Sequence, residues 1–370
     1  MFLKSISLLN FKNYAEVSVQ LIDGINIFTG NNGSGKTNIL DAVHYLSMCK
    51  SYFTPNDIQN IKHDETFAVI NGEFILNDSV DQIFCSIRKE QKKVFKLNSE
   101  EYSKLSEHIG SFPVVMIAPQ DHELITEGSD ERRKFIDSII SQVDHIYLDD
   151  LIKYNKFISQ RNALLKQSSR TGNGDYSLFE YYDLQIATLG SSIYEKRKQF
   201  FLTFEKLFQQ SFNYITSNTE NVSISYVSQL NENSLADLLK ANFNRDLILE
   251  YTSAGIHKDD IEFKINDFTV KRYGSQGQQK TYTTALKLAQ FEFISITKKM
   301  KPIVLLDDIY DKLDDLRVSK LMQMVNEHKF GQVLITDTNE TRIKKIFDEL
   351  KVSVNCFKVQ NGTITNMQTG

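Results

Sequence analysis

The sequence predicts an α/β fold in which a mixed sheet and an antiparallel β lobe are interrupted by an inserted helical arm. Three observations predict it. Short strand-like runs fill residues 1–117, helix formers dominate residues 130–216, and mixed α/β patterning returns from Val222. We therefore expect three segments: a first part of the α/β region at 1–128, a helical arm at 129–218, and a second part of the α/β region at 219–370.

The composition is that of an ordinary folded protein without a strong charge bias. Of the 370 residues, 41% are hydrophobic and 24% are charged, and the formal net charge is −4. These values exclude a mainly disordered chain and a uniformly basic nucleic-acid coat, while local basic patches remain compatible with them. The three cysteines lie far apart, which excludes a disulfide framework and fits a reducing compartment. With no long apolar run and no signal peptide, we expect a cytoplasmic protein with no membrane partner.

The β elements are predicted from short apolar or alternating runs near both ends of the chain. In the first segment they lie at residues 3–9, 15–21, 25–28, 67–74, 82–88, 93–97 and 114–117. Asn71-Gly72 and Asn77-Asp78 have the composition of tight turns between such strands. In the last segment the runs lie at 261–265, 303–306 and 333–335.

The helical elements are predicted from longer periodic stretches. Residues 146–167 and 177–214 flank a polar break at 168–175, which predicts an antiparallel helical hairpin. A further helix is expected at 278–298, where apolar residues recur at the i, i+3, i+4, i+7 spacing. The arm is much shorter than the coiled coils of chromosome-scaffolding ATPases.

A phosphate-binding loop is the strongest functional signal. Gly30-Asn31-Asn32-Gly33-Ser34-Gly35-Lys36-Thr37 matches G-x-x-x-x-G-K-[ST], with a strand-like run before it and an apolar-faced helix that begins around Asn38. Glycines let successive backbone N–H groups point at phosphate oxygens, and the helix N-terminus adds positive potential. We expect residues 30–37 and Asn38 to bind the nucleotide, with Lys36 reaching the β- and γ-phosphates and Thr37 ligating Mg²⁺.

An acidic pair after a buried strand supplies the second half of such a site. Four apolar residues, 303–306, run directly into Asp307 and Asp308. We expect Asp307 to contact the metal ion and Asp308 to orient or deprotonate the attacking water. Lys36 and Asp307 lie 271 positions apart, unlike the arrangement of small GTPases, and an N-K-x-D base-reading motif is absent.

A second anion-binding feature precedes the helix at 278–298. In the run Tyr273-Gly274-Ser275-Gln276-Gly277-Gln278, Ser275 is a good N-cap and Gly277 allows close approach to an anion. The order phosphate loop, S-x-G-Q, acidic strand resembles that of ABC-type ATPases. In those proteins the serine and glycine contact the γ-phosphate held by the other subunit. The resemblance implies an ATP-dependent homodimer, with Ser275, Gly277 and Gln278 reaching the partner's nucleotide.

The chain resembles the RecF family of bacterial DNA-repair ATPases over nearly its whole length. The motifs that carry the resemblance lie at residues 9–14, 30–37, 119–121, 128–137, 160–166, 255–260, 275–280 and 307–308 with 313–314. Lys12 stands where the family has arginine, and Ile256 and Lys258 also depart from its pattern. Asp308 is shorter than the catalytic glutamate of many ABC ATPases, and a switch histidine is absent.

The resemblance implies an ABC-type head with an inserted arm that binds ATP and Mg²⁺ and hydrolyses ATP slowly, with DNA as a stimulus. It places Lys12 and Asn13 near the nucleotide and gives Gln120 a role in sensing Mg²⁺ and the γ-phosphate. The family binds double-stranded DNA and single-strand/double-strand junctions as a dimer, and with RecR and RecO helps to load RecA. It therefore also implies a nucleoid-associated protein that acts in repair and replication restart.

Several readings remain open from the residues alone. An ATP-binding subunit of another ABC-type complex, such as a transporter or a chromosome-associated ATPase, shares the three nucleotide motifs. A scaffold that holds ATP without hydrolysing it is a further alternative.

Local basic clusters are candidate DNA contacts, at residues 132–134, 271–272, 298–301 and 344–345. We read His257 as a structural hydrogen-bonding residue rather than a metal ligand.

Overall fold

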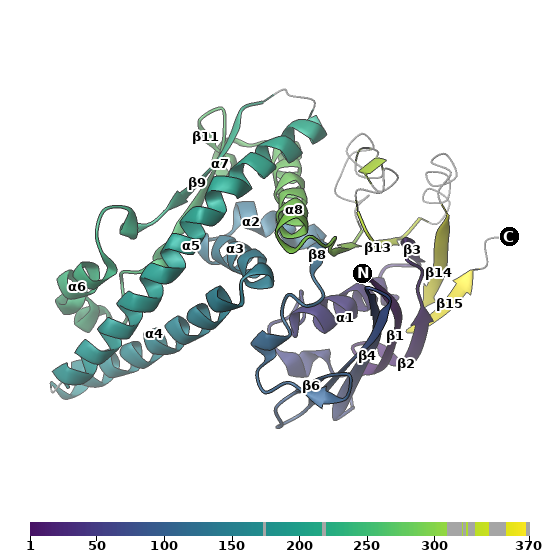
Figure 1. The fold of residues 1–370 in the computed structure, drawn as a ribbon, viewed down its shortest axis with the longest axis horizontal. Coiled ribbons are helices and arrows are strands. Elements are labelled where there is room, and N and C mark those ends of the chain that lie inside the picture. Colours follow the sequence, from purple (N-terminus) through teal and green to yellow (C-terminus); the bar gives the residue numbers. More distant parts are fainter. Residues whose placement is uncertain are drawn as a thin grey trace. The chain divides into compact units, whose positions relative to one another are not determined.

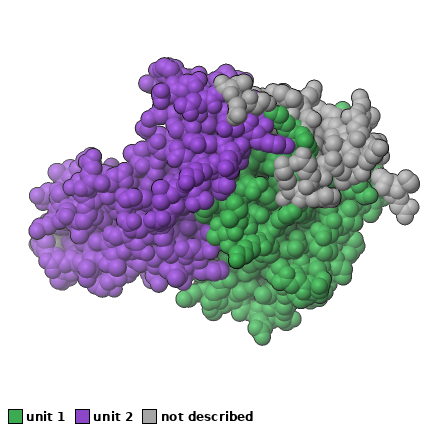
Figure 2. Space-filling view, turned by 45° about the horizontal axis from the view of Figure 1, so that its top comes forward, with its two compact units in different colours: residues 1–121, 280–370 green, residues 122–279 purple. Residues whose placement is uncertain are grey.

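The structure is a computed structural model, and it describes residues 1–172, 175–216, 220–308, 320, 323–324, 330–339 and 353–367. The chain divides into two compact units. Unit 1 combines residues 1–121 with 280–370, and unit 2 is the continuous segment 122–279 (Figure 2).

Unit 1 contains a six-stranded sheet with the order β2-β1-β4-β5-β6-β7, antiparallel throughout. Its strands are β1 (Phe2–Phe11), β2 (Tyr14–Gln20), β4 (Phe67–Leu76), β5 (Ser79–Arg88), β6 (Val94–Leu97) and β7 (Glu100–Glu101). Alternate residues of these strands are buried, so one face of the sheet contributes to the core and the other is open. The predicted antiparallel β lobe is therefore present.

One of the two expected turns in this sheet is wrong. Asn77 and Asp78 both have left-handed backbone and join β4 to β5, as predicted. Asn71-Gly72 instead lies in the middle of β4, opposite Ile6 and Ser7 of β1. A Cβ on Gly72 would lie 2.6 Å from the Leu46 side chain, so this glycine allows a helix to approach the sheet closely.

The second sheet of unit 1 has the order β15-β14-β3-β13-β12-β8 and is parallel except for the pair β14–β15. Its strands are β3 (Ile25–Thr29), β8 (Val114–Ile117), β12 (Ile303–Leu306), β13 (Val333–Asp337), β14 (Val354–Gln360) and β15 (Thr363–Met367). Helix α1 (Lys36–Met48) contacts both sheets and is buried along most of its length. The core of unit 1 therefore forms around α1 (Figure 1).

The sequence did not predict the hairpin of β14 and β15. Cys356, Phe357 and Val359 of β14 are buried, and the Phe357 ring stacks on Phe28 of β3 with centroids 4.8 Å apart. Consecutive buried residues do not give the alternating pattern of a half-buried strand, and their partner strand lies more than three hundred positions earlier.

Unit 2 is mainly helical and contains the predicted hairpin. Helices α4 (His145–Thr171) and α5 (Tyr176–Thr216) pack side by side (Figure 1), and α4 ends at Gly172 in left-handed conformation. The other helices of the unit are α2 (Glu123–Thr126), α3 (Ser129–Val143), α6 (Leu235–Leu249) and α7 (Val270–Tyr273). Helix α8 (Gln276–Lys298) begins in unit 2 and continues into unit 1.

A three-stranded antiparallel sheet, β11-β10-β9, completes unit 2. It consists of β9 (Val222–Val227), β10 (Asp260–Ile265) and β11 (Phe268–Thr269). Strand β9 packs on α5, and β10 packs on α3. Residues 219–279, expected from the sequence to follow the arm as part of the α/β region, therefore cluster with the arm. Single-turn 3₁₀ helices lie at 57–60, 105–107, 119–122, 229–231 and 256–258.

Two fully buried arginines organise the interior of unit 2. Arg197 of α5 pairs with Asp137 at 2.8 Å and with Asp259 at 3.0 Å. Arg161 of α4 pairs with Asp183 at 2.6 Å and Asp246 at 2.7 Å. The Arg161 network joins α4, α5 and α6, and the Arg197 network joins α5, α3 and the residue before β10. Removing one partner of such a buried pair would leave the other charge uncompensated.

Candidate nucleotide-binding site

The predicted phosphate loop lies between β3 and α1 in unit 1, as its sequence indicates. Gly33 and Gly35 have φ values of 76° and 115°, which disfavour any residue with a side chain. A Cβ on Gly35 would lie 2.5 Å from Asn13, whereas a Cβ on Gly33 would meet no atom of the described residues within 4 Å. The loop is therefore closely supported at its helix end and open at Gly33.

Side chains from the β1–β2 turn hold the loop in place. Asn13 donates to the Ser34 carbonyl at 2.9 Å, and the Tyr14 hydroxyl donates to the Gly35 carbonyl at 2.9 Å. Asn38 of α1 donates to the Asn13 side chain at 2.7 Å. Of the residues predicted to contact the nucleotide, Asn13 and Asn38 are thus engaged in supporting the loop.

Two polar groups of the loop are suited to an incoming phosphate. Lys36 is 4% exposed, and its ammonium donates to the Gly30 carbonyl at 3.0 Å and the Asn31 carbonyl at 3.2 Å. Among the described residues, the buried Ser34 hydroxyl has no hydrogen-bond partner. Asn31 and Asn32 are exposed beside the open Gly33. A buried cation and an unsatisfied hydroxyl next to open space fit the phosphate oxygens that this type of loop binds.

The structure brings together Thr37, from the first sequence segment of unit 1, and Asp307, from its second segment. The Thr37 hydroxyl lies 2.9 Å and 3.1 Å from the two carboxylate oxygens of Asp307, and the Thr336 hydroxyl donates to the same carboxylate at 2.7 Å. Burial raises the pKa of Asp307, and the hydrogen bonds from Thr336 and Thr37 and the charge of Lys36 oppose this shift.

These ligand types fit a magnesium ion. A hydroxyl and a carboxylate oxygen are hard ligands, and Mg²⁺ in nucleotide sites takes one or two of them while water and phosphate complete its shell. Within the described residues no group of three or more His, Cys, Asp or Glu side chains is placed to form a metal cage. An ion at Thr37 and Asp307 would therefore depend on the nucleotide phosphates.

Asp308 differs from Asp307 in its backbone conformation, which is left-handed. Its φ is 42°, and its N–H donates to the Thr336 hydroxyl at 3.0 Å. Thr336 thus contacts both acidic residues. Asp314, which belongs to the same sequence motif, lies outside the described residues, as do Lys344 and Lys345.

Lys12 and Gln120 have partners other than the loop. The Lys12 ammonium lies 2.5 Å from the buried carboxylate of Asp41 on α1. Gln120 donates from its side chain to the Tyr52 carbonyl at 3.3 Å. Lys12 is therefore tied to the helix that follows the loop, and Gln120 to the segment just after that helix.

Sequence reasoning missed a buried polar cluster in unit 1. Lys287 of α8 is 3% exposed and lies 2.9 Å from Asp121 and 2.8 Å from the Tyr52 hydroxyl, which itself donates to Asp121. Because Gln120 precedes Asp121 and bonds the Tyr52 carbonyl, the cluster fixes the segment that carries Gln120. The run Pro119-Gln120-Asp121 was the only available signal, since nothing in a single sequence marks Lys287 as buried.

The S-x-G-Q run forms a capped helix start in unit 2, as predicted. Gln278 donates from its backbone to the Ser275 hydroxyl at 3.2 Å, and Ser275 donates from its backbone to the Gln278 side chain at 2.8 Å. This reciprocal arrangement is a capping box. The Gln278 amide also donates to Glu220 at 2.5 Å. Ser275 is exposed and Gly277 half-buried, so the helix N-terminus is open to a ligand.

The three basic residues at 132–134 form ion pairs with carboxylates of unit 2. Arg132 forms a bidentate pair with Asp260 at 2.7 Å and 3.1 Å, and Arg133 pairs with Asp130. Lys134 pairs with Glu131 at 2.6 Å. The motif runs 128–137 and 255–260 therefore contact each other, and Arg132 and Arg133 are largely covered by this contact while Lys134 stays exposed.

His257 has the structural role expected from the sequence. Its ring nitrogens lie 2.8 Å from the Tyr154 hydroxyl and 3.0 Å from the Thr252 carbonyl. Burial lowers the pKa of His257 to about 4, so the ring is neutral near pH 7.

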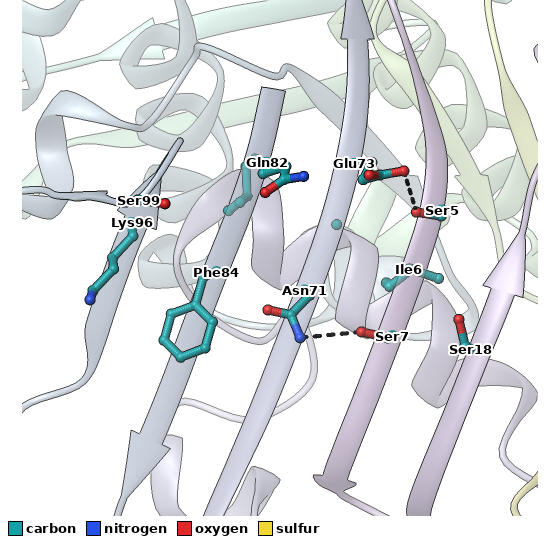
Figure 3. Close-up of a pocket in the computed structure, with 12 residues that line it drawn as sticks. Ser5, Ile6, Ser7, Ser18, Asn71, Glu73, Gln82, Phe84, Lys96 and Ser99 are labelled. Atoms are coloured by element: carbon teal, nitrogen blue, oxygen red, sulfur yellow. Dashed lines mark hydrogen bonds between the residues drawn. The ribbon is translucent and has the colours of Figure 1, made fainter. Parts of the chain in front are cut away.

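A separate cavity of about 570 Å³ lies on the open face of the antiparallel sheet (Figure 3). Hydroxyl and amide side chains dominate its lining, with Asn71 donating to Ser7 and Ser5 donating to Glu73. None of the predicted nucleotide-binding residues lines it. Across the described part of the chain, no helix is long and apolar enough to cross a membrane.

Sequence comparisons give the family context. The family model described as "RecF/RecN/SMC N terminal domain" matches residues 2–365. A "DNA replication and repair protein RecF" of Flavobacterium johnsoniae is 49% identical over 346 residues, covering 94% of this chain and 96% of that protein. The protein of the same name from Parabacteroides distasonis is 46% identical over 372 residues, covering 100% of both.

Structural comparisons agree with the sequence. A structure of the recombination mediator protein RecF-ATP in the RecFOR pathway matches with a TM-score of 0.90 and 29% identity, covering 99% of this chain and 98% of that one. An Smc head domain from Pyrococcus furiosus, bound to the C-terminal domain of ScpA, matches with a TM-score of 0.56 and 16% identity over 99% of this chain and 96% of that one. At that identity, the second match concerns the fold alone.

Proposed function

Because the chain belongs to the RecF family of DNA replication and repair proteins, we propose that it is an ATP-dependent recombination mediator whose ATP-bound homodimer clamps double-stranded DNA. Its fold is that of an ABC-type ATPase head with a helical arm. In this proposal the protein binds near single-strand/double-strand junctions and works with RecR and RecO to load RecA. Slow ATP hydrolysis releases it from DNA.

The observation that carries the proposal is the contact of Thr37 with Asp307. It joins the end of the phosphate loop to the end of β12, where a magnesium nucleotide is held in this fold. Lys36 and the Ser34 hydroxyl would bind the phosphates, and Thr37 and Asp307 would hold Mg²⁺. The ion would neutralise charge on the phosphates when bound. The ATP-bound relative, 29% identical over nearly the full chain, supports ATP as the nucleotide.

The remaining predicted residues take supporting roles in the proposal. Asp308 orients or deprotonates the attacking water, and its short side chain is one reason to expect slow turnover. Gln120, fixed by the Tyr52 carbonyl, senses the metal ion and the γ-phosphate. Ser275 and Gly277 contact the nucleotide of the other subunit from the exposed start of α8.

The test is the solution mass with and without Mg·ATP, measured by analytical ultracentrifugation. We expect a monomer that becomes a dimer only with ATP. Ser275→Arg, at an exposed position, should bind ATP but remain monomeric because a bulky cation replaces the hydroxyl that meets the partner's nucleotide. Asp308→Asn should give a long-lived ATP dimer. A wild-type mass unmoved by ATP, with ATP demonstrably bound, would contradict the clamp.

DNA binding and hydrolysis are tested separately. The affinity of the ATP-bound protein for duplex DNA should fall steeply with salt, because neutralised phosphates release counterions. Steady-state turnover without DNA should lie well below the ~10 s⁻¹ typical of enzymes. A flat salt profile would contradict direct phosphate contacts, and a turnover near ~10 s⁻¹ without a partner would contradict slow release.

A further inference from the structure

We propose that two exposed aromatic residues of unit 2, Phe268 and Tyr273, form a contact surface for a second copy of this chain. The proposal rests on the ATP-dependent dimer proposed above and assigns residues to its interface that the nucleotide motifs do not include. Their ring centroids lie 5.3 Å apart. Phe268 is 59% exposed and Tyr273 is 66% exposed.

Phe268 is held by a short, well-fixed hairpin. Strands β10 and β11 pair Ile265 with Phe268, and the two residues between them, Asn266 and Asp267, have φ values of 49° and 69°. Left-handed backbone at both positions is the geometry of the tight hairpin turn that matches strand twist. Asn266 also exchanges hydrogen bonds with Asn221 at the start of β9. The ring is therefore presented on a rigid support.

Tyr273 is tied to the start of helix α8. The Gln279 side chain donates to the Val270 carbonyl at 3.3 Å and to the Gly274 carbonyl at 3.1 Å, which links α7 to α8. A Cβ on Gly274 would lie 2.7 Å from the Val270 carbonyl, so the chain turns tightly between Tyr273 and Ser275. The two rings and the Ser275 hydroxyl are consequently parts of one platform.

This platform indicates which partner the rings meet. In the proposed dimer, Ser275 contacts the nucleotide of the other subunit, and Tyr273 lies only two residues before it in a fixed turn. A partner that contacts Ser275 is therefore expected to meet Tyr273 as well, and with it the adjoining Phe268 ring. Large aromatic side chains have few rotatable bonds and carry much of the binding energy of protein interfaces. We name the three residues Phe268, Tyr273 and Ser275 the signature platform.

The first test uses sedimentation equilibrium of the full chain with Mg·ATP. The double variant Phe268→Ser/Tyr273→Ser should weaken the dimer by about tenfold or more while ATP binding to the monomer stays within about twofold of wild type. The matched control is Tyr176→Ser, because Tyr176 is also 66% exposed in unit 2 and also has a neighbouring ring, that of Phe243. This control should dimerise as the wild type does.

The outcomes separate this inference from the proposed function. A wild type that does not dimerise with ATP overturns the clamp and the inference together. A wild type that dimerises, with a double variant that dimerises equally well, overturns the inference alone. Loss of dimer in the Tyr176→Ser control as well would show a general effect of removing exposed rings and would also overturn it.

A second measurement does not depend on the stability of a variant interface. A photo-crosslinking phenylalanine analogue at position 268, irradiated with Mg·ATP and duplex DNA present, should give a covalent species of twice the chain mass. Omitting ATP should abolish that species. Crosslinking to the DNA, or dimer formation independent of ATP, would assign the rings to another partner and overturn the proposal.

Discussion

Asp307 is a buried carboxylate whose neighbours favour its charged form. Burial raises its pKa, and two threonine hydroxyls donate to it. The sequence indicated its place, because four apolar residues run directly into it. Lys287 could not be found in the same way, since its burial depends on Asp121 and Tyr52, which lie far away in the sequence. The position of Asp307 could be predicted because the strand next to it in the sequence marks it. The burial of Lys287 could not be predicted because its partners are far away in the sequence.

The first prediction concerns the Asp307 carboxylate. Asp307→Asn keeps the shape and the ability to accept from Thr37 but removes the charge that attracts Mg²⁺. We expect the Mg²⁺ concentration needed for tight ATP binding to rise by about 10- to 100-fold, while metal-free nucleotide binding changes little. Titration of a fluorescent ATP analogue at several Mg²⁺ concentrations measures this. Asp308→Asn is the matched control, and an equal effect there would argue against a metal role specific to Asp307.

At the scale of elements, periodicity predicted most strands of the described chain and its longest helices, but it gave no bounds for α2, α3, α6 or α7. The helical hairpin, α1, α8 and the strands before the loop and the acidic pair are present near their expected bounds. Gly72 was wrongly assigned to a turn because a glycine that admits a helix has the same sequence appearance as one that allows a bend. Strands β14 and β15 were missed because their burial is set by β3 and not by local alternation.

The second prediction concerns the contact of α1 with the segment around His108. This ring is fully buried, and one nitrogen lies 2.6 Å from the Leu46 carbonyl. Burial lowers the pKa of His108 to about 4, and the same holds for His44 and His257. Because these pKa values are below the unfolded value of about 6.5, the unfolded chain binds protons that the folded chain does not. Stability is complete above about pH 6.5 and is lost as the pH falls toward about 4.

Between about pH 6.5 and 4, each of these histidines should lower the free energy of unfolding by about 1.4 kcal/mol for every unit by which the pH falls. Urea unfolding at about pH 7, 6 and 5 measures the slope. His108→Gln removes one titrating group, so its slope should be shallower than that of the wild type even if its stability at pH 7 is lower. An unchanged slope would show that His108 does not titrate with unfolding.

At the scale of the whole molecule, the sequence predicted a mainly helical segment at 130–216 and a return to mixed helices and strands from Val222. It could not tell which sheet the returning strands join, because a strand's partner is not encoded locally. In the structure β9 and β10 pair with each other and cluster with the arm, while β12, β13 and β14 extend the sheet of β3. Each unit has its own buried charges, so perturbing one unit should leave the chemistry of the other intact.

The third prediction, at the scale of the whole chain, follows from this separation. Arg197→Met leaves the carboxylates of Asp137 and Asp259 without their buried cation, which should destabilise unit 2 by about 3–5 kcal/mol. ATP binding at unit 1 should remain within about twofold. Differential scanning calorimetry with a nucleotide-binding assay measures both quantities, and Lys198→Met at the neighbouring exposed position is the control. A loss of ATP-binding free energy as large as the loss of stability in Arg197→Met would show that the two units are energetically coupled.

The topology of unit 1 has a consequence for synthesis on the ribosome. Strand β3, which leads into the phosphate loop, lies between β13 and β14, and both neighbours belong to the last part of the chain. The continuous segment 122–279 emerges earlier and holds its own hydrogen-bond partners. A nascent chain therefore completes its arm before it can complete its nucleotide pocket. A truncated or stalled product that lacks these two strands would leave β3, and the phosphate loop that follows it, without neighbours on either side in the sheet.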